Sequence, residues 1–301
     1  MSLKLKKVNN IKITPLINQK FNEKTVHGFR WFANPYGNIA LIARTKSGKT
    51  NCIYRCLENT LKPKTNVMIF CPSINTDQTY KKMKGMLKKK KCNVKCFENF
   101  QEKGINHLNI LVNELSTKEE KKEQKNESRD IQIPLTMDEI MFTNHPSVLG
   151  MGEVTEQRMI PNGERMVVAP KKAKKKKGKL APEWVVIIDD LSSLCRDPSI
   201  TRLLCRSRHL KMRIFISLHS ITDLQPAAFG QLANIMLFQN INEERIEQVA
   251  DKCGLTFRQD TKKRRFLCEL YDIATATPYS FLNCDTQNMT FRKNFDEEFD
   301  I

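Results

Sequence analysis

The sequence has no long hydrophobic run. Its longest apolar stretches, such as residues 39–43 and 184–188, are five residues each, whereas a membrane-spanning helix needs about 20 residues. The N-terminus carries lysines, but neither an apolar stretch nor a small-residue cleavage site follows them, so a secretory leader is not expected. These absences predict an intracellular protein without a membrane segment.

A zinc site is disfavoured because suitable ligand sets are absent. The cysteine pairs Cys52/Cys56 and Cys92/Cys96 have three intervening residues, and no histidine pair completes a set of four ligands. Several of the ten cysteines lie within apolar runs, such as Cys71 at the end of residues 67–71. Reduced, buried thiols are therefore the favoured interpretation, with a metal–thiolate site as the alternative.

Acidic residues are also few relative to basic ones. The chain has 51 Lys and Arg against 33 Asp and Glu, a net charge of +18. This excess favours a polyanionic partner, most simply nucleic acid, although a lysine-rich composition can also reflect a biased genome. Residues 81–95 contain eight lysines and residues 171–179 contain seven. Each run is a candidate DNA contact or a solvated face, and the second resembles a nuclear-import signal as well.

Short apolar segments alternate with helix-like segments along the chain. This pattern predicts an α/β fold, a mostly parallel sheet with helices on both faces. A helix is expected at residues 50–61, where the apolar positions follow helical spacing. The expected strands are residues 38–43, 67–71, 93–97, 184–188, 213–218 and 234–238.

The middle of the chain has a different composition. Residues 118–130 are almost purely charged, and such a segment cannot bury a core. We interpret residues 116–183 as a charged, partly disordered insertion that leaves the sheet, with a little structure at residues 131–142. The expected organisation is an N-terminal arm (1–36), a P-loop domain (37–295) interrupted by this insertion, and an acidic tail (296–301).

Residues 43–50 fit the phosphate-loop pattern, with alanine in place of its first glycine. The motif lies between an expected strand and an expected helix, although an incidental strand–turn–helix corner is the alternative. Gly48 would let the backbone turn its N–H groups toward a phosphate, Lys49 would bridge the β- and γ-phosphates, and the Thr50 hydroxyl would be a Mg²⁺ ligand. The predicted ATP-binding residues are Ala43, Arg44, Thr45, Lys46, Ser47, Gly48, Lys49 and Thr50. Glycine is frequent in such loops where Ala43 and Lys46 stand, which predicts weak nucleotide affinity.

Two carboxylates follow the fully apolar segment 184–188. In a parallel sheet they would lie at the carboxyl edge, where ligands bind. Asp189 is the predicted second Mg²⁺ ligand, through a water, and Asp190 the predicted catalytic residue that orients or deprotonates the attacking water. Most P-loop ATPases have the longer glutamate at the second position of this acidic pair. The alternative is that the pair caps a helix beginning near Ser192.

Two further catalytic candidates lie downstream. The segment 213–218 is followed by His219 and Ser220, and one of these is the candidate γ-phosphate sensor. The alternative is that His219 is a surface histidine without a role. Arg202, Arg206 and Arg208 are expected to line a helix that could offer an arginine, Arg208 by preference, to a neighbouring subunit. Solvated helix charges are the alternative for all three.

Taken together, these segments resemble the DNA-packaging ATPases of the FtsK/HerA superfamily, in the branch found in poxviruses, other large DNA viruses, virophages and Maverick/Polinton elements. The sequence Arg208-His209 before a strand that ends in a polar residue is typical of this branch, although its usual sensor is glutamine and His219 stands there. Residues 278–282 resemble the branch's final strand. The similarity covers roughly residues 30–115 and 184–285. The stretches that carry it are residues 43–50, residues 67–73 with Asp77 and Tyr80, residues 184–191 and residues 206–220.

This resemblance implies a RecA-like (ASCE) P-loop NTPase fold and an ATP- and Mg²⁺-dependent hydrolase. It also implies a homo-oligomeric ring, a pentamer or hexamer, that threads double-stranded DNA into a viral capsid and meets capsid or portal proteins. Such a protein would work in the host cytoplasm or nucleus, or within the virion. The rival interpretations are a cellular HerA-like translocase or helicase and a nucleic-acid-binding relic that no longer hydrolyses ATP. A GTPase is disfavoured because no Asn-Lys-x-Asp motif occurs, and a small-molecule kinase is disfavoured by Asp190.

Overall fold

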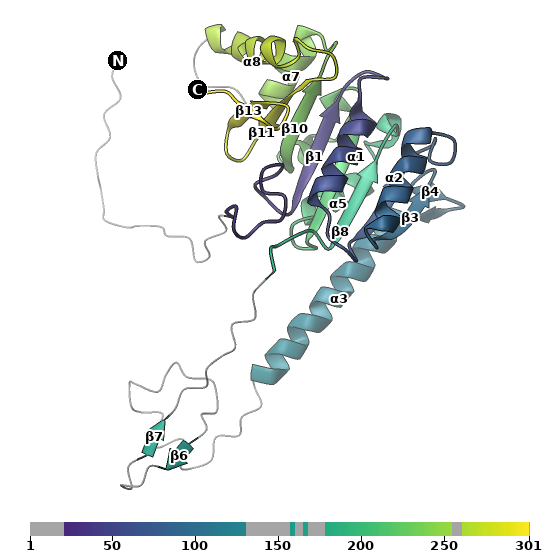
Figure 1. Cartoon of the computed structure of the whole chain (residues 1–301). Helices are drawn as coiled ribbons and strands as arrows, with labels where there is room; N and C mark the ends of the chain where they lie inside the picture. Colours follow the sequence, from purple (N-terminus) through teal and green to yellow (C-terminus); the bar gives the residue numbers. More distant parts are fainter. Residues whose placement is uncertain (1–20, 131–156, 160–164, 168–177, 255–260, 301) are drawn as a thin grey trace, which may run out of the picture.

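A nine-stranded sheet organises the chain (Figure 1) in a computed structural model that describes residues 21–130, 157–159, 165–167, 178–254 and 261–300. The strand order is β13-β12-β11-β10-β1-β9-β8-β2-β3. Six strands are mutually parallel: β1 (Gly37–Ile42), β2 (Asn66–Phe70), β3 (Asn93–Phe97), β8 (Trp184–Ile188), β9 (Met212–Leu218) and β10 (Leu232–Phe238). Three antiparallel strands extend one edge: β11 (Phe281–Asp285), β12 (Thr290–Lys293) and β13 (Glu297–Glu298). The α/β prediction is confirmed, and all six expected strands are present within two residues of their expected bounds.

Helices cover both faces of the sheet because consecutive strand residues point to opposite sides. Ile187 packs in one core with side chains of α1 and α2, whereas Ile188 packs in a second core on the other face. The first face carries α1 (Lys49–Thr60) and α2 (Gln78–Lys89). The second carries α3 (His107–Asp130), α5 (Pro198–Arg206), α6 (Pro226–Phe229), α7 (Glu243–Lys252) and α8 (Thr261–Ala274).

The parallel strands bring several loops to one edge of the sheet. Ile42 at the end of β1 lies beside Leu218 at the end of β9 and beside Leu237 of β10. The antiparallel β11 begins at the same edge, since Phe281 pairs with Phe238. The loops that begin at residues 43, 189, 219 and 239, and the turn before β11, therefore share the carboxyl edge, where ligands of open α/β sheets bind.

The strand expected at residues 278–282 begins three residues later. Tyr279 has a φ of 65°, which places it in a turn, because a strand requires a negative φ. The side chain of Gln239 holds this turn by donating to the carbonyl oxygens of Thr275 (2.5 Å) and Thr277 (2.9 Å). The strand that follows is not the last, because β12 and β13 come after it.

The charged segment after Ser116 continues α3, which Figure 1 shows projecting beyond the sheet. Two small antiparallel pairs lie outside the main sheet: β4 (Gln101–Glu102) with β5 (Ile105–Asn106), and β6 (Gln157–Met159) with β7 (Arg165–Val167). Short 3-10 helices occupy Ser192–Leu194 and Ile221–Asp223. In the N-terminal region, Val26 forms an isolated bridge with Leu180, and Phe32 is buried. The structure expected at residues 131–142 and the lysines at 171–177 lie outside the described residues, and the proposed domain boundaries stay a prediction.

Candidate active site

The phosphate-loop sequence lies between β1 and α1, as predicted. The Ala43 N–H donates to the Leu218 carbonyl at 3.1 Å, which ties the start of the loop to β9. Gly48 precedes the first residue of α1 with a φ of 98°, a conformation that glycine adopts without steric cost. Lys46 has a positive φ of 65° without being glycine. The loop therefore directs the unpaired N–H groups at the start of α1 toward the carboxyl edge, where they can bind an anion.

Lys49 is almost fully buried inside the loop, with 5% of its surface exposed. Its Nζ donates to the carbonyl oxygens of Ala43 at 3.0 Å and Arg44 at 3.4 Å. Burial lowers the pKa of its ammonium group, and the charges of Asp189 and Asp190 oppose this shift. A lysine buried among carbonyl oxygens beside a helix N-terminus is placed to bind a phosphate that enters the loop.

Asp189 is fully buried at the end of β8 and accepts three hydrogen bonds. Its Oδ2 accepts from the Thr50 hydroxyl at 2.8 Å and from the Tyr80 hydroxyl at 2.6 Å. Its Oδ1 accepts from the backbone N–H of Asp190 at 3.1 Å. The sequence motifs at residues 43–50 and 184–190 therefore meet at one point, through side chains that are 139 positions apart in the chain.

The Thr50 and Asp189 oxygens fit a magnesium–phosphate ligand. Mg²⁺ at nucleotide sites is held by one or two protein oxygens, together with phosphates and waters. A hydroxyl and a carboxylate 2.8 Å apart, next to a phosphate loop, supply oxygens of this kind. Within the described residues no group of three or more His, Cys, Asp and Glu side chains is placed to hold a metal, and all ten cysteines are free thiols.

Asp190 differs from Asp189 in exposure and backbone conformation. Its side chain is exposed, and its φ is 56°. Partial desolvation raises the pKa of the carboxyl group, the charge of Asp189 raises it further, and Lys49 and His219 act in the opposite direction. A carboxyl group that is accessible and less acidic than usual is suited to accept a proton from water.

The alternative that the acidic pair caps a helix is wrong. The helix that follows is a short 3-10 helix at Ser192–Leu194, its capping residue is Leu191, and no side chain caps it. The Asp189 carboxylate instead bonds to Thr50 and Tyr80, which belong to α1 and α2.

His219 is exposed at the end of β9 and lies next to the phosphate loop, with its Nδ1 3.3 Å from the Ala43 carbonyl oxygen. Ser220 is engaged differently, because its hydroxyl accepts from the Thr222 N–H while Asp223 bonds to the Ser220 N–H. This capping box uses the Ser220 side chain locally. Of the two sensor candidates, His219 is the one that faces the phosphate loop.

The arginine candidates lie at the opposite edge of the sheet. Arg208 is exposed in the turn before β9, not on α5, which ends at Arg206. After Ser207 the chain turns into β9, and the Met212 N–H donates to the Ser207 carbonyl at 2.8 Å. Arg202 and Arg206 are on α5, and they donate to Asn113 and Ser116 of α3 at 2.8 Å each. None of these arginines contacts the phosphate loop of its own chain, so a catalytic role for Arg208 remains a prediction about a neighbouring subunit.

Tyr80 is the site residue whose role was missed by sequence reasoning. It is buried on α2, and burial together with the Asp189 charge raises the pKa of its hydroxyl well above the ordinary value. The hydroxyl therefore stays protonated and donates to the carboxylate. In the sequence, Tyr80 was noted only as part of the resemblance to packaging ATPases. Nothing in the residues around it predicts a hydrogen bond to Asp189, which is 109 residues away.

No protein-family model matches the chain, and neither does any curated protein. Solved structures do match. The genome packaging NTPase B204 from Sulfolobus turreted icosahedral virus 2, in complex with ATP-gammaS, has a TM-score of 0.43 and 13% identity over 86% of this chain and 96% of that chain. The DNA-packaging ATPase B204 from Sulfolobus Turreted Icosahedral Virus has a TM-score of 0.44 and 15% identity over 86% of this chain and 97% of that chain. Within the described residues, no helix has the length and apolar character needed to cross a membrane.

Proposed function

We propose that the chain is an ATP-hydrolysing motor that translocates double-stranded DNA, of the kind that packages viral genomes. The hydrogen bond between Thr50 of the phosphate loop and Asp189 of the acidic pair, 2.8 Å long, carries the proposal. This bond supports hydrolysis because it brings three groups together at the carboxyl edge of the sheet. They are the phosphate-binding start of α1, the oxygen ligands of Thr50 and Asp189, and the accessible carboxylate of Asp190.

Each residue has a defined task in this proposal. The N–H groups at the start of α1 and the Lys49 ammonium would bind the phosphates. Thr50 would hold Mg²⁺ directly, and Asp189 would hold it through a water. The chemistry supplied by bound Mg²⁺ is neutralisation of charge on the transferring phosphoryl group. Asp190 orients the attacking water and accepts its proton. His219, beside the phosphate loop, senses the γ-phosphate.

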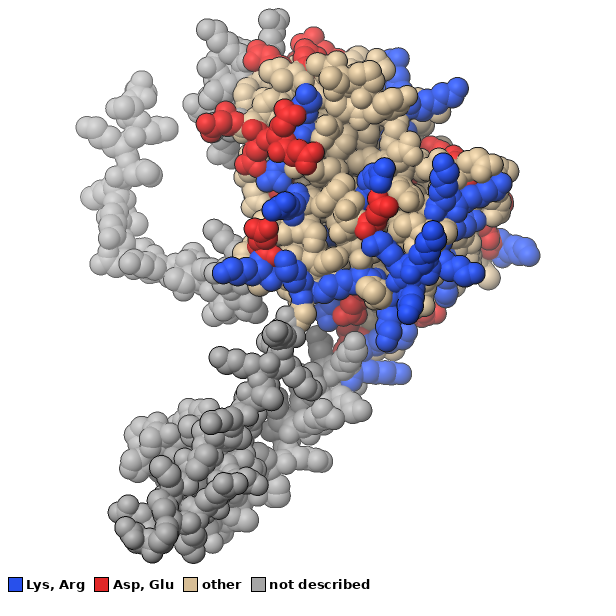
Figure 2. Space-filling model, in the orientation of Figure 1, with Lys and Arg blue, Asp and Glu red and all other residues tan. Residues whose placement is uncertain are grey.

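The DNA surface that we propose is centred on α2. Figure 2 shows Lys and Arg side chains gathered over the part of the molecule where α2 lies. Residues 81–95 carry eight lysines, and none of them forms an ion pair with an acidic residue in the part of the chain that the structure describes. Unpaired ammonium groups can displace the counterions of a DNA backbone, which gives sequence-independent affinity.

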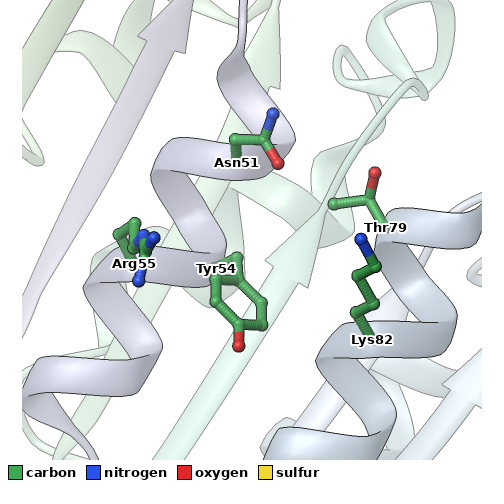
Figure 3. Close-up of a pocket in the computed structure, with 5 residues that line it drawn as sticks. All are labelled: Asn51, Tyr54, Arg55, Thr79 and Lys82. Atoms are coloured by element: carbon green, nitrogen blue, oxygen red, sulfur yellow. The ribbon is translucent and has the colours of Figure 1, made fainter.

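A groove between α1 and α2 belongs to the same surface. It encloses about 440 Å³ and is lined by Asn51, Tyr54, Arg55, Thr79 and Lys82. Figure 3 shows Thr79 and Lys82 on the side of α2 that faces α1. Because α1 also begins at the phosphate loop, a phosphate backbone in this groove would contact the same helix whose first residues bind ATP in this proposal.

The ring, the capsid partner and the location in a host cell or virion are proposed from the resemblance of residues 43–50, 67–73, 184–191 and 206–220 to viral packaging ATPases. A cellular HerA-like translocase would share the ATP site and the basic surface. A binding relic would share only the basic surface, and Ala43 and Lys46 are the departures that make it a rival.

A Lys49→Ala variant tests the proposal. ATP turnover is measured with and without double-stranded DNA, and DNA binding is measured in parallel. We expect DNA to stimulate turnover by the native chain, and Lys49→Ala to reduce turnover to background while DNA binding persists, because the ammonium is part of the ATP site and not of the α2 surface. The matched control is Lys121→Ala, which removes an exposed lysine of α3.

Two outcomes would contradict this assignment. Full turnover by Lys49→Ala would place catalysis elsewhere, and a native chain that binds DNA without any turnover would be the binding relic. Displacement of a DNA triplex by the native chain with ATP would show translocation. Filling of empty capsids in the presence of ATP would then separate a packaging motor from a cellular translocase.

A further inference from the structure

A second cleft opens beside the phosphate loop, on the side away from the acidic pair. It encloses about 220 Å³ between residues 44–47 and a wall formed by Gln239, Asn240, Pro278 and Tyr279. In the sheet order, β9 and β8 lie on one side of β1, whereas β10 and β11 lie on the other. The acidic pair therefore lies on one side of the phosphate loop and this cleft on the other.

This placement decides where the rest of a nucleotide would lie. In the proposed site, the γ-phosphate faces Asp189 and Asp190, at the end of β8. The phosphate chain crosses the loop above β1, so the nucleoside must leave the loop on the β10 and β11 side. The cleft beside residues 44–47 lies on that side of the phosphate loop.

Tyr279 gives the cleft an aromatic wall. Its side chain is 72% exposed, more than any other large hydrophobic residue among those described. The ring also lies close to the phosphate loop, since a Cβ added to Gly48 would be 3.4 Å from its Cδ1. An exposed aromatic ring at the rim of a cleft has a π-face available for a planar base.

The backbone holds this ring in place at a conformational cost. Tyr279 adopts a φ of 65°, a left-handed conformation that is strained for a residue other than glycine. The turn is fixed by the two hydrogen bonds from Gln239 and by the Ser280 hydroxyl, which donates to the Thr277 carbonyl at 2.5 Å. Strained residues that their surroundings hold in place are concentrated at ligand sites.

We propose that this cleft is the nucleoside subsite of the proposed ATP site, with the Tyr279 ring stacked on the purine base and Gln239 positioning the turn that carries it. The inference rests on the proposed function, because the phosphate loop sets the direction of the nucleotide. Stacking is tolerant of base identity, so the subsite would favour nucleotides over bare polyphosphate more strongly than it favours one purine over another.

The test compares two probes that share the phosphate loop but not the base. Binding of ATP and of inorganic tripolyphosphate, each with Mg²⁺, is measured by calorimetry for the native chain, Tyr279→Ala, Tyr279→Phe and Lys49→Ala. We expect Tyr279→Ala to weaken ATP binding about tenfold and to leave tripolyphosphate binding unchanged. Tyr279→Phe keeps the ring and should bind ATP as the native chain does. Lys49→Ala should weaken both probes.

The outcomes separate the subsite from the ATP site itself. If Tyr279→Ala weakens both probes equally, the ring supports only the loop, and the subsite assignment is overturned. Unchanged ATP binding by Tyr279→Ala overturns it as well. If Lys49→Ala leaves both probes unaffected, the proposed phosphate site fails, and the subsite fails with it.

Discussion

The hydroxyl of Tyr80 donates a 2.6 Å hydrogen bond to Oδ2 of Asp189, the same oxygen that accepts from Thr50. Tyr80 lies on α2, whose exposed surface carries lysines, while Asp189 directly follows β8, an interior strand of the sheet. This bond links the basic helix directly to the metal-binding carboxylate of the proposed site. A rearrangement at Asp189 on nucleotide binding therefore has a direct path to the proposed DNA surface.

Tyr80→Phe removes this hydrogen bond and little else. We expect the free energy of unfolding to fall by about 1.5–3 kcal/mol, because a buried hydrogen bond to a charged group is lost. Urea denaturation measures the change. In an Asp189→Asn background the same substitution should cost much less, since the charged acceptor is already absent. An equal loss in both backgrounds would show that the bond to Asp189 contributes nothing.

Asp190→Asn should raise stability while it removes hydrolysis. The folded-state pKa of Asp190 is raised above its ordinary value of 3.8, so ionisation of this carboxyl group opposes folding. That penalty is complete above the folded-state pKa and disappears as the pH falls below the ordinary value. The Tm of the variant should exceed that of the native chain at neutral pH, and the difference should shrink in acid.

The same variant should lose about 10²–10⁴-fold in turnover, the usual contribution of a general base. Its control is Asp251→Asn, which changes an exposed carboxylate on α7 and should leave turnover unaltered. A stability gain that does not vary with pH would point instead to the positive φ of Asp190, which asparagine tolerates better.

The sequence predicted that the phosphate-loop segment and the acidic pair would meet, because the signals of both motifs are local. A parallel sheet brings the ends of its strands to one edge, so motifs at Lys49 and Asp189 could be joined without knowledge of the packing. Tyr80 could not be assigned in this way, because its bond to Asp189 depends on how α2 packs on the sheet. The cleft at Tyr279 was missed for a related reason, since the sequence predicted a strand where Gln239 holds a turn.

Backbone conformation explains the remaining differences. Arg208 was expected on a helix, but α5 ends at Arg206 and a hydrogen-bonded turn leads into β9. The positive φ of Asp190 left no trace in the sequence. Lys46 stands where such loops often have glycine, and its observed φ of 65° is one that glycine adopts without steric cost. The sequence had been read there only as a sign of weak nucleotide affinity.

Substitution of Lys46 tests whether the loop is strained. Lys46→Gly relieves the positive φ, whereas Lys46→Ala removes the side chain and keeps the strain. We expect the glycine variant to be more stable than the alanine variant by up to about 1 kcal/mol, after allowing for the greater freedom of glycine in the unfolded chain. Denaturation by urea gives the difference. An alanine variant at least as stable as the glycine variant would show that the loop stores no strain at this residue.

The α2 surface should determine how DNA binding depends on salt. Lys82 and Lys89 are both exposed and lie about two turns apart on α2. If both contact phosphates, Lys82→Ala with Lys89→Ala should reduce the slope of log Kobs against log salt by about 2, at roughly 0.9 per contact. Fluorescence anisotropy with a labelled duplex measures this slope. The control pair is Lys118→Ala with Lys121→Ala on α3, and an equal reduction there would mean that only net charge matters.

Arg208 can act in catalysis only if it reaches the site of a neighbouring subunit, because in its own chain it lies at the opposite edge of the sheet from Lys49. Lys49→Ala and Arg208→Ala should therefore each be inactive alone. Arg208→Ala should be inactive because no positive charge then stabilises the negative charge of the transition state.

Mixing the two variants in one ring tests this arrangement. A Lys49→Ala subunit would still offer Arg208 to the intact phosphate loop of an Arg208→Ala neighbour. We expect part of the ATP turnover to return on mixing, with a maximum near equal proportions. Arg202→Ala is the control, since Arg202 bonds to Asn113 of its own chain. If the two variants stay inactive in every mixture, or if Arg208→Ala alone keeps full turnover, then Arg208 does not supply this charge.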